Sequence, residues 1–319
     1  MKLIPTLLSV LLIHIAAPAF AAEKSGKSDK AAGTAKKSAK PKKKPAPFKW
    51  INKPQGELPK GVSHGTYQSR AMEVEIGYCI YLPPSYKSGK AKGQRFPVVY
   101  YLHGGRPGSE LKSVKLAGQI REFQVSGEVG EAIYVFVNGG LLSHYNMPKF
   151  GSWGEWTFVH ELIPHIDKNY RTIAKRSGRG IEGFSQGGRG TARIMFKYPE
   201  LFVSAAPGGG GHATEKRISE TGGWENENLK FIKGANTWDR ARDYAKHQSP
   251  KLNILAYVGN KGFNYENNLE WAAFLKSLGI EHRLLVIPDA PHSVRIIYDS
   301  QGAEIMQFHL RNFGRAKGK

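Results

Sequence analysis

The stretch GIEGFSQGGRGTA, residues 180–192, constrains the fold of this chain more than any other part of its sequence. It places Ser185 between Gly183 and Gly187, after a short apolar run and before a run with the pattern of a helix. A G-x-S-x-G sequence between a strand and a helix is typical of a nucleophile elbow, the tight turn that lifts a serine hydroxyl above a sheet. A side chain at either glycine would crowd that turn. We therefore predict that Ser185 is a nucleophile, and a purely structural turn is the alternative.

The order of apolar runs predicts the fold class. Strand-like runs alternate with helix-like patterns, which indicates an α/β fold with three layers and a mostly parallel, buried central sheet. The expected strands are residues 72–82, 96–102, 132–137, 180–184, 201–206, 252–258 and 283–287, and the expected helices are residues 156–167, 187–198, 264–278 and about 303–313. The polar stretch 212–247 interrupts this rhythm and is interpreted as an insertion, either a lid or a helical surface excursion without function.

The first 49 residues have a different composition. Lys2 precedes an apolar run over residues 3–17, and small residues follow at Ala19 and Ala21, so residues 1–21 are predicted to be a signal peptide rather than a membrane anchor. Residues 22–49 hold ten lysines among Ala, Ser, Gly and Pro, which predicts a disordered tether. The folded domain is then residues 50–319. We expect a secreted or periplasmic protein without a transmembrane anchor once the signal is cleaved.

The formal net charge of +21 points to anionic partners. Residues 1–49 carry +9 of it, and the remaining +12 belongs to the rest of the chain. An acidic polysaccharide or an anionic envelope polymer could bind through the basic tether; a solvated, solubilising tail is the alternative. Nucleic acid is not expected, because an exported chain rarely meets it and no recognition motif is present. The only cysteine, Cys79, excludes an intrachain disulfide and is predicted to be a packed strand residue.

A serine nucleophile needs a base and an oxyanion hole, and the sequence offers candidates for both. His292, in IPDAPHS, follows the expected strand 283–287 at the edge of the sheet where loops converge on the elbow, so it is the predicted base. A packed loop histidine is the alternative. The stretch VVYYLHGGRPG runs from a strand into a glycine turn. Amides around Gly105 and Arg106, together with that of Gln186, are the predicted oxyanion hole.

The acid that should orient the base is harder to place. The segment YVGNKGFNYENNLEW follows the expected strand 252–258 and contains no aspartate. Its first carboxylate is Glu266, near the start of a helix that Asn264 could cap, so Glu266 is the predicted acid. A glutamate that merely complements the helix dipole is the alternative. Asp289 lies nearer to His292 in sequence, but it shares that loop and would have to turn back on it.

A metal site is not predicted. HELIP-H, residues 160–165, places its second histidine one position too late for the zinc motif H-E-x-x-H, with a proline in between. A serine nucleophile that is activated by a histidine requires neither a metal nor an organic cofactor. We therefore expect no cofactor.

These motifs together resemble the esterase D / feruloyl esterase type of α/β-hydrolase, a family that also includes acetylxylan esterases, enterochelin esterases and mycolyltransferases. The resemblance extends over residues 65–314 and is carried by YCIYLPPSY, FPVVYYLHGGRPGSE, VNGG, ELIPHIDKNYRT, IEGFSQGGRGTARIMFKYPELF, VGNKGFNYENNLEWAAFLKSLGI and PDAPHS. It implies a Ser185 nucleophile, a His292 base and oxyanion amides near Gly105 and Gln186. Members of the family often have an aspartate where this chain has Gly262. Either Glu266 has taken that role or the enzyme is impaired.

The expected function is a secreted serine carboxylesterase that works through an acyl-enzyme on Ser185. Acetyl or feruloyl groups on a polysaccharide are the substrates that the resemblance implies. His144, Tyr145 and Trp153, in the loop after VNGG, are predicted to line the pocket, with ordinary loop packing as the alternative. Two other functions stay open: a catalytically degraded, esterase-like protein that binds acidic glycans or envelope polymers, and an acyltransferase of the same fold.

Overall fold

The computed structural model describes residues 48–88, 93–148, 151–212 and 234–314. All of these belong to the compact unit Pro47–Lys319. The predicted signal peptide, all but the end of the predicted tether, and residues 213–233 of the predicted insertion lie outside the described residues. At the start of the described chain, Phe48 packs edge-on against Trp50, with ring centroids 4.7 Å apart. No helix within these ranges combines the length and the apolar character that crossing a bilayer requires.

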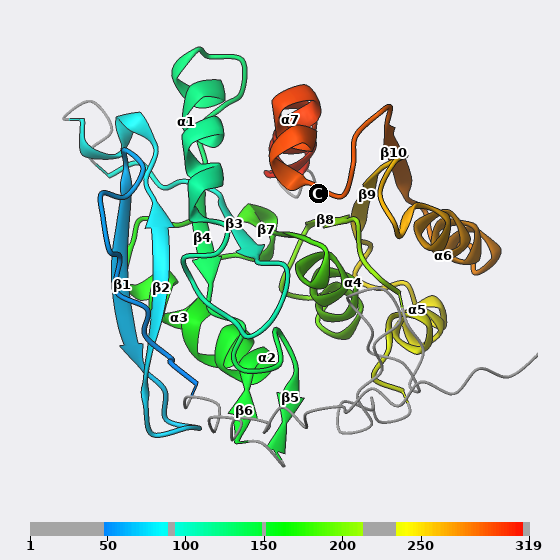
Figure 1. Cartoon of the computed structure of the whole chain (residues 1–319), viewed down its shortest axis with the longest axis horizontal. Helices are drawn as coiled ribbons and strands as arrows, with labels where there is room; N and C mark the ends of the chain where they lie inside the picture. Colours follow the sequence, from blue (N-terminus) through cyan, green and yellow to red (C-terminus); the bar gives the residue numbers. More distant parts are fainter. Residues whose placement is uncertain (1–47, 89–92, 149–150, 213–233, 315–319) are drawn as a thin grey trace, which may run out of the picture. The chain divides into compact units, whose positions relative to one another are not determined.

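Within the described ranges, eight strands form one twisted sheet in the order β1-β2-β4-β3-β7-β8-β9-β10 (Figure 1). The strands are β1 (Val62–Gln68), β2 (Glu75–Tyr81), β3 (Val98–Leu102), β4 (Ile133–Val137), β7 (Arg179–Phe184), β8 (Ser204–Gly208), β9 (Asn253–Gly259) and β10 (Arg283–Ile287). The pairs β1–β2 and β2–β4 are antiparallel, and every pair from β4 to β10 is parallel. The prediction of a mostly parallel central sheet is confirmed.

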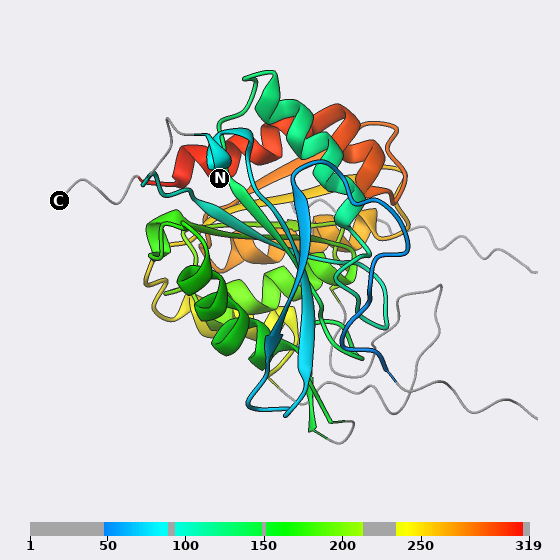
Figure 2. The same cartoon turned by 90° about the vertical axis from the view of Figure 1, so that its left-hand side faces the viewer.

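Helices cover both faces of the sheet, which confirms the three-layer α/β prediction. Figure 2 shows α1 (Ala117–Val125) and α7 (Val294–Asn312) on one face, and α3 (Ile163–Asn169) and α4 (Gln186–Lys197) on the other. α5 (Thr237–Ala245) and α6 (Tyr265–Ser277) also pack on the α4 side. The shorter elements are η1 (Pro84–Lys87), η3 (Val114–Leu116), β5 (Asn146–Met147), β6 (Ser152–Trp153), α2 (Gly154–Trp156), the π-helical η5 (Thr157–Leu162) and η6 (Arg176–Gly178).

Apolar side chains of the buried strands alternate between the two helical layers, as the period of two in a strand requires. In β7, Ile181 faces the core under α4, whereas Phe184 joins the core under α1 and α7. Cys79 of β2 is fully buried in the second of these cores, as the alternation of its strand predicted. Since parallel strands end at the same edge of the sheet, the turns after β3, β7, β8, β9 and β10 are brought together there.

The last helix differs most from its prediction, because α7 begins at Val294 rather than near residue 303. Gly302, inside the helix, explains why the sequence was misleading. A Cβ atom at Gly302 would lie 2.7 Å from the ring of Phe123 in α1. This glycine therefore serves the close approach of α7 to α1 and does not mark the start of a helix.

The observed bounds of one other helical segment and one strand also differ from the predicted bounds. The predicted helix 156–167 consists of α2, a π-helical segment and α3, with Pro164 in the first turn of α3, where a missing amide hydrogen is tolerated. The predicted strand 201–206 corresponds to β8, which begins at Ser204 and continues to Gly208.

The described part of the 212–247 stretch belongs to the helical layer. Asn236 caps α5 by accepting hydrogen bonds from the amides of Trp238 and Asp239. Tyr244 of α5 packs on Phe196 of α4, with ring centroids 5.2 Å apart. Residues 234–247 thus pack against α4, and this part of the predicted insertion is not a lid.

Candidate active site

The nucleophile turn joins β7 to α4, and its geometry follows from close packing. Ser185 occupies the single position between the strand and the helix and has φ +61°, an unusual value for a residue other than glycine. A Cβ atom at Gly183 would lie 2.6 Å from the carbonyl of Gly187, and one at Gly187 would overlap the carbonyl of Leu102 in β3. The sequence therefore forms this turn because both glycines bring backbone segments closer together than any side chain permits.

His292 lies against the serine, as predicted. It belongs to the loop between β10 and α7, and its Nε2 is 2.9 Å from Ser185 Oγ. The imidazole packs between the rings of Phe184 and Phe263, with centroid distances of 4.6 and 4.2 Å. Burial against these rings lowers the pKa of His292 to about 4, so the ring is neutral near pH 7 and able to accept the serine proton.

The predicted oxyanion loop follows β3 and lies directly beside the nucleophile. A Cβ atom at Gly104 would lie 3.1 Å from Ser185 Cβ and 3.8 Å from Ser185 Oγ. Gly105 has φ +64°, a conformation that favours glycine. Gln186 is the first residue of α4, so its amide is among those that the helix leaves unpaired at its start. Gln186 thus directly follows Ser185, whereas Gly105 and Arg106 follow Gly104, the residue that lies beside the serine.

Two side chains from the loop between β4 and β5 donate hydrogen bonds to carbonyl groups of the oxyanion loop. His144 Nε2 donates to the carbonyl of His103 at 3.0 Å, and Ser143 Oγ donates to that of Gly105 at 2.7 Å. In a trans peptide the N–H points away from the C=O of the same unit. Fixing the Gly105 carbonyl therefore turns the Arg106 amide in the opposite direction, away from Ser143.

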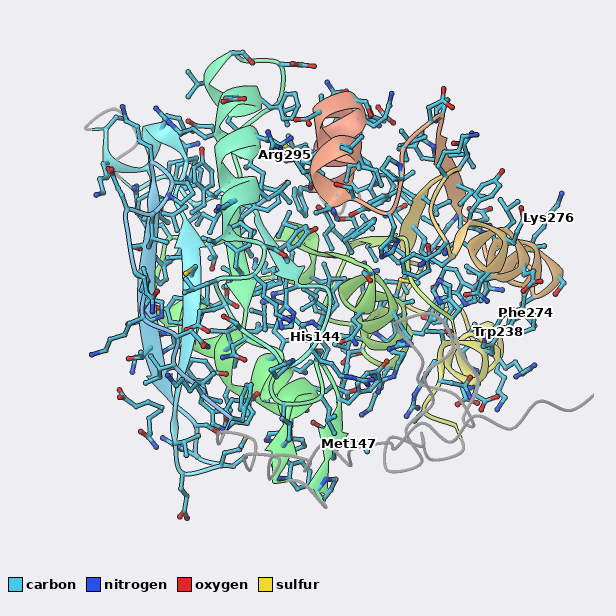
Figure 3. All side chains as sticks on the ribbon, in the orientation of Figure 1. His144, Met147, Trp238, Phe274, Lys276 and Arg295 are labelled. Atoms are coloured by element: carbon cyan, nitrogen blue, oxygen red, sulfur yellow. The ribbon has the colours of Figure 1, made fainter. Side chains whose placement is uncertain are left out.

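The residues predicted to line the pocket lie deeper than expected. His144 is fully buried and packs against His103 with the rings tilted and their centroids 4.6 Å apart. Figure 3 labels it in the middle of the view, whereas Met147 marks the β5–β6 hairpin. Tyr145 is also buried and lies under the guanidinium of Arg193, 4.0 Å from the ring centroid. Trp153, in β6, is half-buried. In this structure His144 and Tyr145 support the loop and are not open to a substrate.

The structure does not bring Glu266 to His292. Glu266 lies in the first turn of α6, and its side chain is exposed. Asp289 is exposed as well. Nδ1 of His292 is buried and has no hydrogen-bond partner among the residues that the structure describes. Within the described chain, no carboxylate therefore accepts a hydrogen bond from Nδ1 of His292, where the acid was predicted to lie.

Gly262, the position at which the resemblance implies an aspartate, does lie beside the base. A Cβ atom there would be 3.7 Å from the backbone nitrogen of His292 and 3.6 Å from Oδ1 of Asn264. Its φ is not in the left-handed region, so the backbone does not require glycine. The turn that should supply the acid is built in the expected place, but without the acid.

Two neighbours of His292 were missed by the sequence analysis. Asn264 was predicted as a helix cap, yet its side chain makes no capping hydrogen bond and instead donates to the carbonyl of Gly209. Phe263, which packs against His292 with the two rings tilted, is 71 % exposed, unusual for a large apolar side chain. Their adjacency to the Gly262 position was the available signal. No group of three potential metal-ligating side chains occurs in the described ranges.

Several known proteins are similar to this chain. A family profile described as "Putative esterase" matches residues 69–278. An esterase of Mycobacterium tuberculosis is 29 % identical over 208 residues, which cover 62 % of this chain and 44 % of that protein. An endo-1,4-beta-xylanase/feruloyl esterase of Xylanibacter ruminicola is 35 % identical over 157 residues, which cover 45 % of this chain and 21 % of that protein. The chain thus spans less than half the length of these curated relatives.

A solved structure of a ferulic acid esterase superposes with a TM-score of 0.64 at 22 % identity, covering 81 % of this chain and all of that one. At this identity the likeness shows the fold alone. The fold is that of the α/β-hydrolase esterases.

Proposed function

The chain belongs to the "Putative esterase" family, and on that premise we propose that it is a serine carboxylic ester hydrolase with Ser185 as nucleophile and His292 as base. The observation that carries the proposal is the 2.9 Å contact between Ser185 Oγ and His292 Nε2 at the nucleophile turn. Ser185 attacks the ester carbonyl while its proton moves to His292. The C–O bond then breaks, the alcohol leaves with that proton, and the acyl group stays on Ser185. Water activated by His292 hydrolyses the acyl-enzyme.

The negative charge that develops on the carbonyl oxygen is stabilised by the amides of Arg106 and Gln186, with that of Gly105 beside them. Two observations support this part of the proposal. Gly104 lies next to the serine, and the hydrogen bond from Ser143 fixes the Gly105 carbonyl, so that the Arg106 amide points away from Ser143. His144 then acts by fixing the loop. Removal of one such donor typically lowers kcat by about 10²- to 10³-fold.

For the substrate we propose an ester on an extracellular glycan, with an acetyl or feruloyl acyl group. The feruloyl esterase named among the relatives supports an aromatic acyl group. Phe263 offers it an exposed ring beside His292. The apolar run 3–17 supports export, to a secreted or periplasmic location. The basic tether would then hold the enzyme near acidic polysaccharide or envelope polymers.

The full-length protein should hydrolyse an aryl acetate or methyl ferulate. Ser185→Ala should lower kcat by at least about 10⁴-fold, because the nucleophile is lost, whereas Ser300→Ala, an exposed serine on α7, should change nothing. Equal rates for the two variants would contradict the proposal.

A binding protein derived from an esterase is the second candidate, and the lack of a carboxylate at His292 in the described chain favours it. An inert parent protein that still binds acidic polysaccharide in a salt-sensitive manner would support this candidate. An acyltransferase would instead give acylated sugar when a sugar acceptor competes with water.

A further inference from the structure

The nitrogen of His292 that faces away from the serine has no acceptor within the described chain. When Nε2 accepts the serine proton, Nδ1 is the protonated nitrogen of the neutral ring, and it stays protonated in the imidazolium that follows. This Nδ1 is buried. A buried N–H without an acceptor costs free energy, and it leaves the tautomer and the ring orientation unfixed.

Asn264 presents the complementary group. Its side chain is buried, and its Nδ2 donates to the carbonyl of Gly209. This bond identifies the other end of the amide as the acceptor, and Oδ1 is buried without a hydrogen-bond partner among the described residues. The amide therefore has one end fixed and a free acceptor at the other.

Two glycines lie next to both His292 and this amide. A Cβ atom at Gly209, whose carbonyl holds Asn264, would lie 3.4 Å from Cε1 of His292, the carbon between the two ring nitrogens. A Cβ atom at Gly262 would lie 3.6 Å from Asn264 Oδ1 and 3.7 Å from the backbone nitrogen of His292. Nε2 is engaged by Ser185, so Nδ1, next to the carbon that joins the ring to the backbone, is the nitrogen left for this amide.

We propose that Asn264 is the positioning residue of the reaction, its Oδ1 accepting a hydrogen bond from His292 Nδ1 once substrate is bound. The inference rests on the proposed function of Ser185 and His292. The proton of Ser185 moves to Nε2, the Nδ1 proton stays on the ring, and Asn264 neither gains nor loses a proton. Catalytic hydrogen bonds are often long in a free enzyme and shorten in the substrate complex, so this contact is expected to form when the substrate binds.

An amide in this place fixes the tautomer but adds no charge. Cys–His–Asn sites use an amide in the same position. Compared with a carboxylate, an amide gives weaker stabilisation of the imidazolium, so the proposal predicts a working but slow enzyme.

Asn260 provides a matched control. Its Oδ1 is also buried without a partner within the described ranges, and it belongs to the same turn. Its backbone amide pairs with the carbonyl of Ile287, and within the described chain its side chain makes no hydrogen bond to His292 and does not crowd the two glycines. Loss of activity at residue 264 but not at residue 260 would therefore separate the proposed role from the mere loss of a buried amide.

The experiment compares Asn264→Ala, Asn264→Asp and Asn260→Ala with the full-length parent protein, using aryl ester hydrolysis. Asn264→Ala should lower kcat about 10- to 100-fold with little change in KM. Asn260→Ala should stay within about twofold of the parent. Asn264→Asp keeps the acceptor but loses the donor to Gly209, and it should match or exceed the parent rate. A rate for Asn264→Asp as low as that of Asn264→Ala, or a parental rate for Asn264→Ala, would overturn the inference.

The pKa of His292, followed by NMR, tests the same contact without any reaction. A carboxylate beside Nδ1 favours the imidazolium, so Asn264→Asp should raise this pKa, and an unchanged value would refute the contact. This readout also separates the two proposals. If no ester is hydrolysed but the pKa rises, the proposed function fails while the contact between residue 264 and His292 stands.

Discussion

Two turns at the same edge of the sheet differ in how strongly packing determines them. In the β7–α4 turn, a Cβ atom at Gly187 would overlap the Leu102 carbonyl, and one at Gly183 would lie 2.6 Å from the Gly187 carbonyl. In the β9–α6 turn, the nearest atom to a Cβ atom at Gly262 would be the Gly259 carbonyl oxygen at 3.1 Å. The first turn admits no side chain at its glycines, whereas the second has room for one.

The two turns also differ in the hydrogen bonding of their polar groups. Ser185 Oγ is bonded to His292, and the Ser185 amide donates to the Gly208 carbonyl at 2.8 Å. In the second turn, the side-chain oxygens of Asn260 and Asn264 have no partner in the part of the chain that the structure describes. The reacting serine is thus paired, although the buried side-chain amide of Gln186 next to it has no partner within the described chain. The turn that should orient the base supplies no carboxylate to His292 among the described residues. A site of this kind should keep its chemistry while running below the rate that a carboxylate would allow.

The largest expected difference is steric. Gly187→Ala should destabilise the protein by about 3 kcal/mol or more, because the new methyl group would overlap the carbonyl of Leu102. Gly262→Ala should cost about 1 kcal/mol or less, since only a small shift of the Gly259 carbonyl is needed. Thermal unfolding of both variants measures the difference. An equal loss of stability in the two variants would contradict the proposed difference in packing between the two turns.

The next effect is a gain of activity. Gly262→Asp places a carboxyl group between the backbone of His292 and Asn264, where it can stabilise the imidazolium. Because replacing a triad aspartate by asparagine lowers kcat about 10⁴-fold in a serine protease, we expect a rise of about 10-fold or more. Ester hydrolysis by the variant tests this, with Gly262→Ala as the control for the side chain itself. An unchanged or lower rate would mean that the second turn is not limiting.

The pH dependence should be modest. The neutral imidazole is the base, so activity persists above the pKa of His292, which burial lowers to about 4, and falls as the pH drops through it. The groups packed on the ring, Phe184 and Phe263, carry no charge, and burial is the cause of the shift. The acid limb of kcat/KM should thus lie near pH 4 in the parent protein and higher in Gly262→Asp. A parental limb near pH 6.5 would indicate an unperturbed histidine.

The smallest effect is expected at Glu266. This carboxylate is exposed in the first turn of α6, so Glu266→Gln should change kcat by less than about twofold. The same assay as for Gly262→Asp measures it. A loss of about 100-fold would restore Glu266 as the acid, and it would refute the proposal that Asn264 is the residue that orients His292.

The sequence carried enough information for the nucleophile turn because its requirements are local. Gly183, Ser185 and Gly187 lie within five positions, and the strand and helix around them have clear patterns. His292 could be placed from topology alone, since it follows the last parallel strand. The resemblance to esterases also drew attention to Gly262.

The missed features depend on tertiary contacts that no local pattern encodes. His144 was predicted to line the pocket, yet it is buried and donates to the carbonyl of His103. Asn264 reads as a helix cap, yet the carbonyl of Gly209, far away in sequence, takes its donor. Gly302 reads as a helix breaker but allows α7 to approach Phe123.

The most direct test of the account is to trap the acyl-enzyme. The full-length protein is mixed with an aryl acetate, quenched in acid within milliseconds to seconds, and analysed by intact-protein and peptide mass spectrometry. We predict one acetyl group per chain on the peptide that contains Ser185, and a much slower appearance of that acetyl group in His292→Ala. An acetyl group on another residue, or hydrolysis without any adduct in a Ser185→Ala protein, would contradict the assignment of Ser185 as the nucleophile.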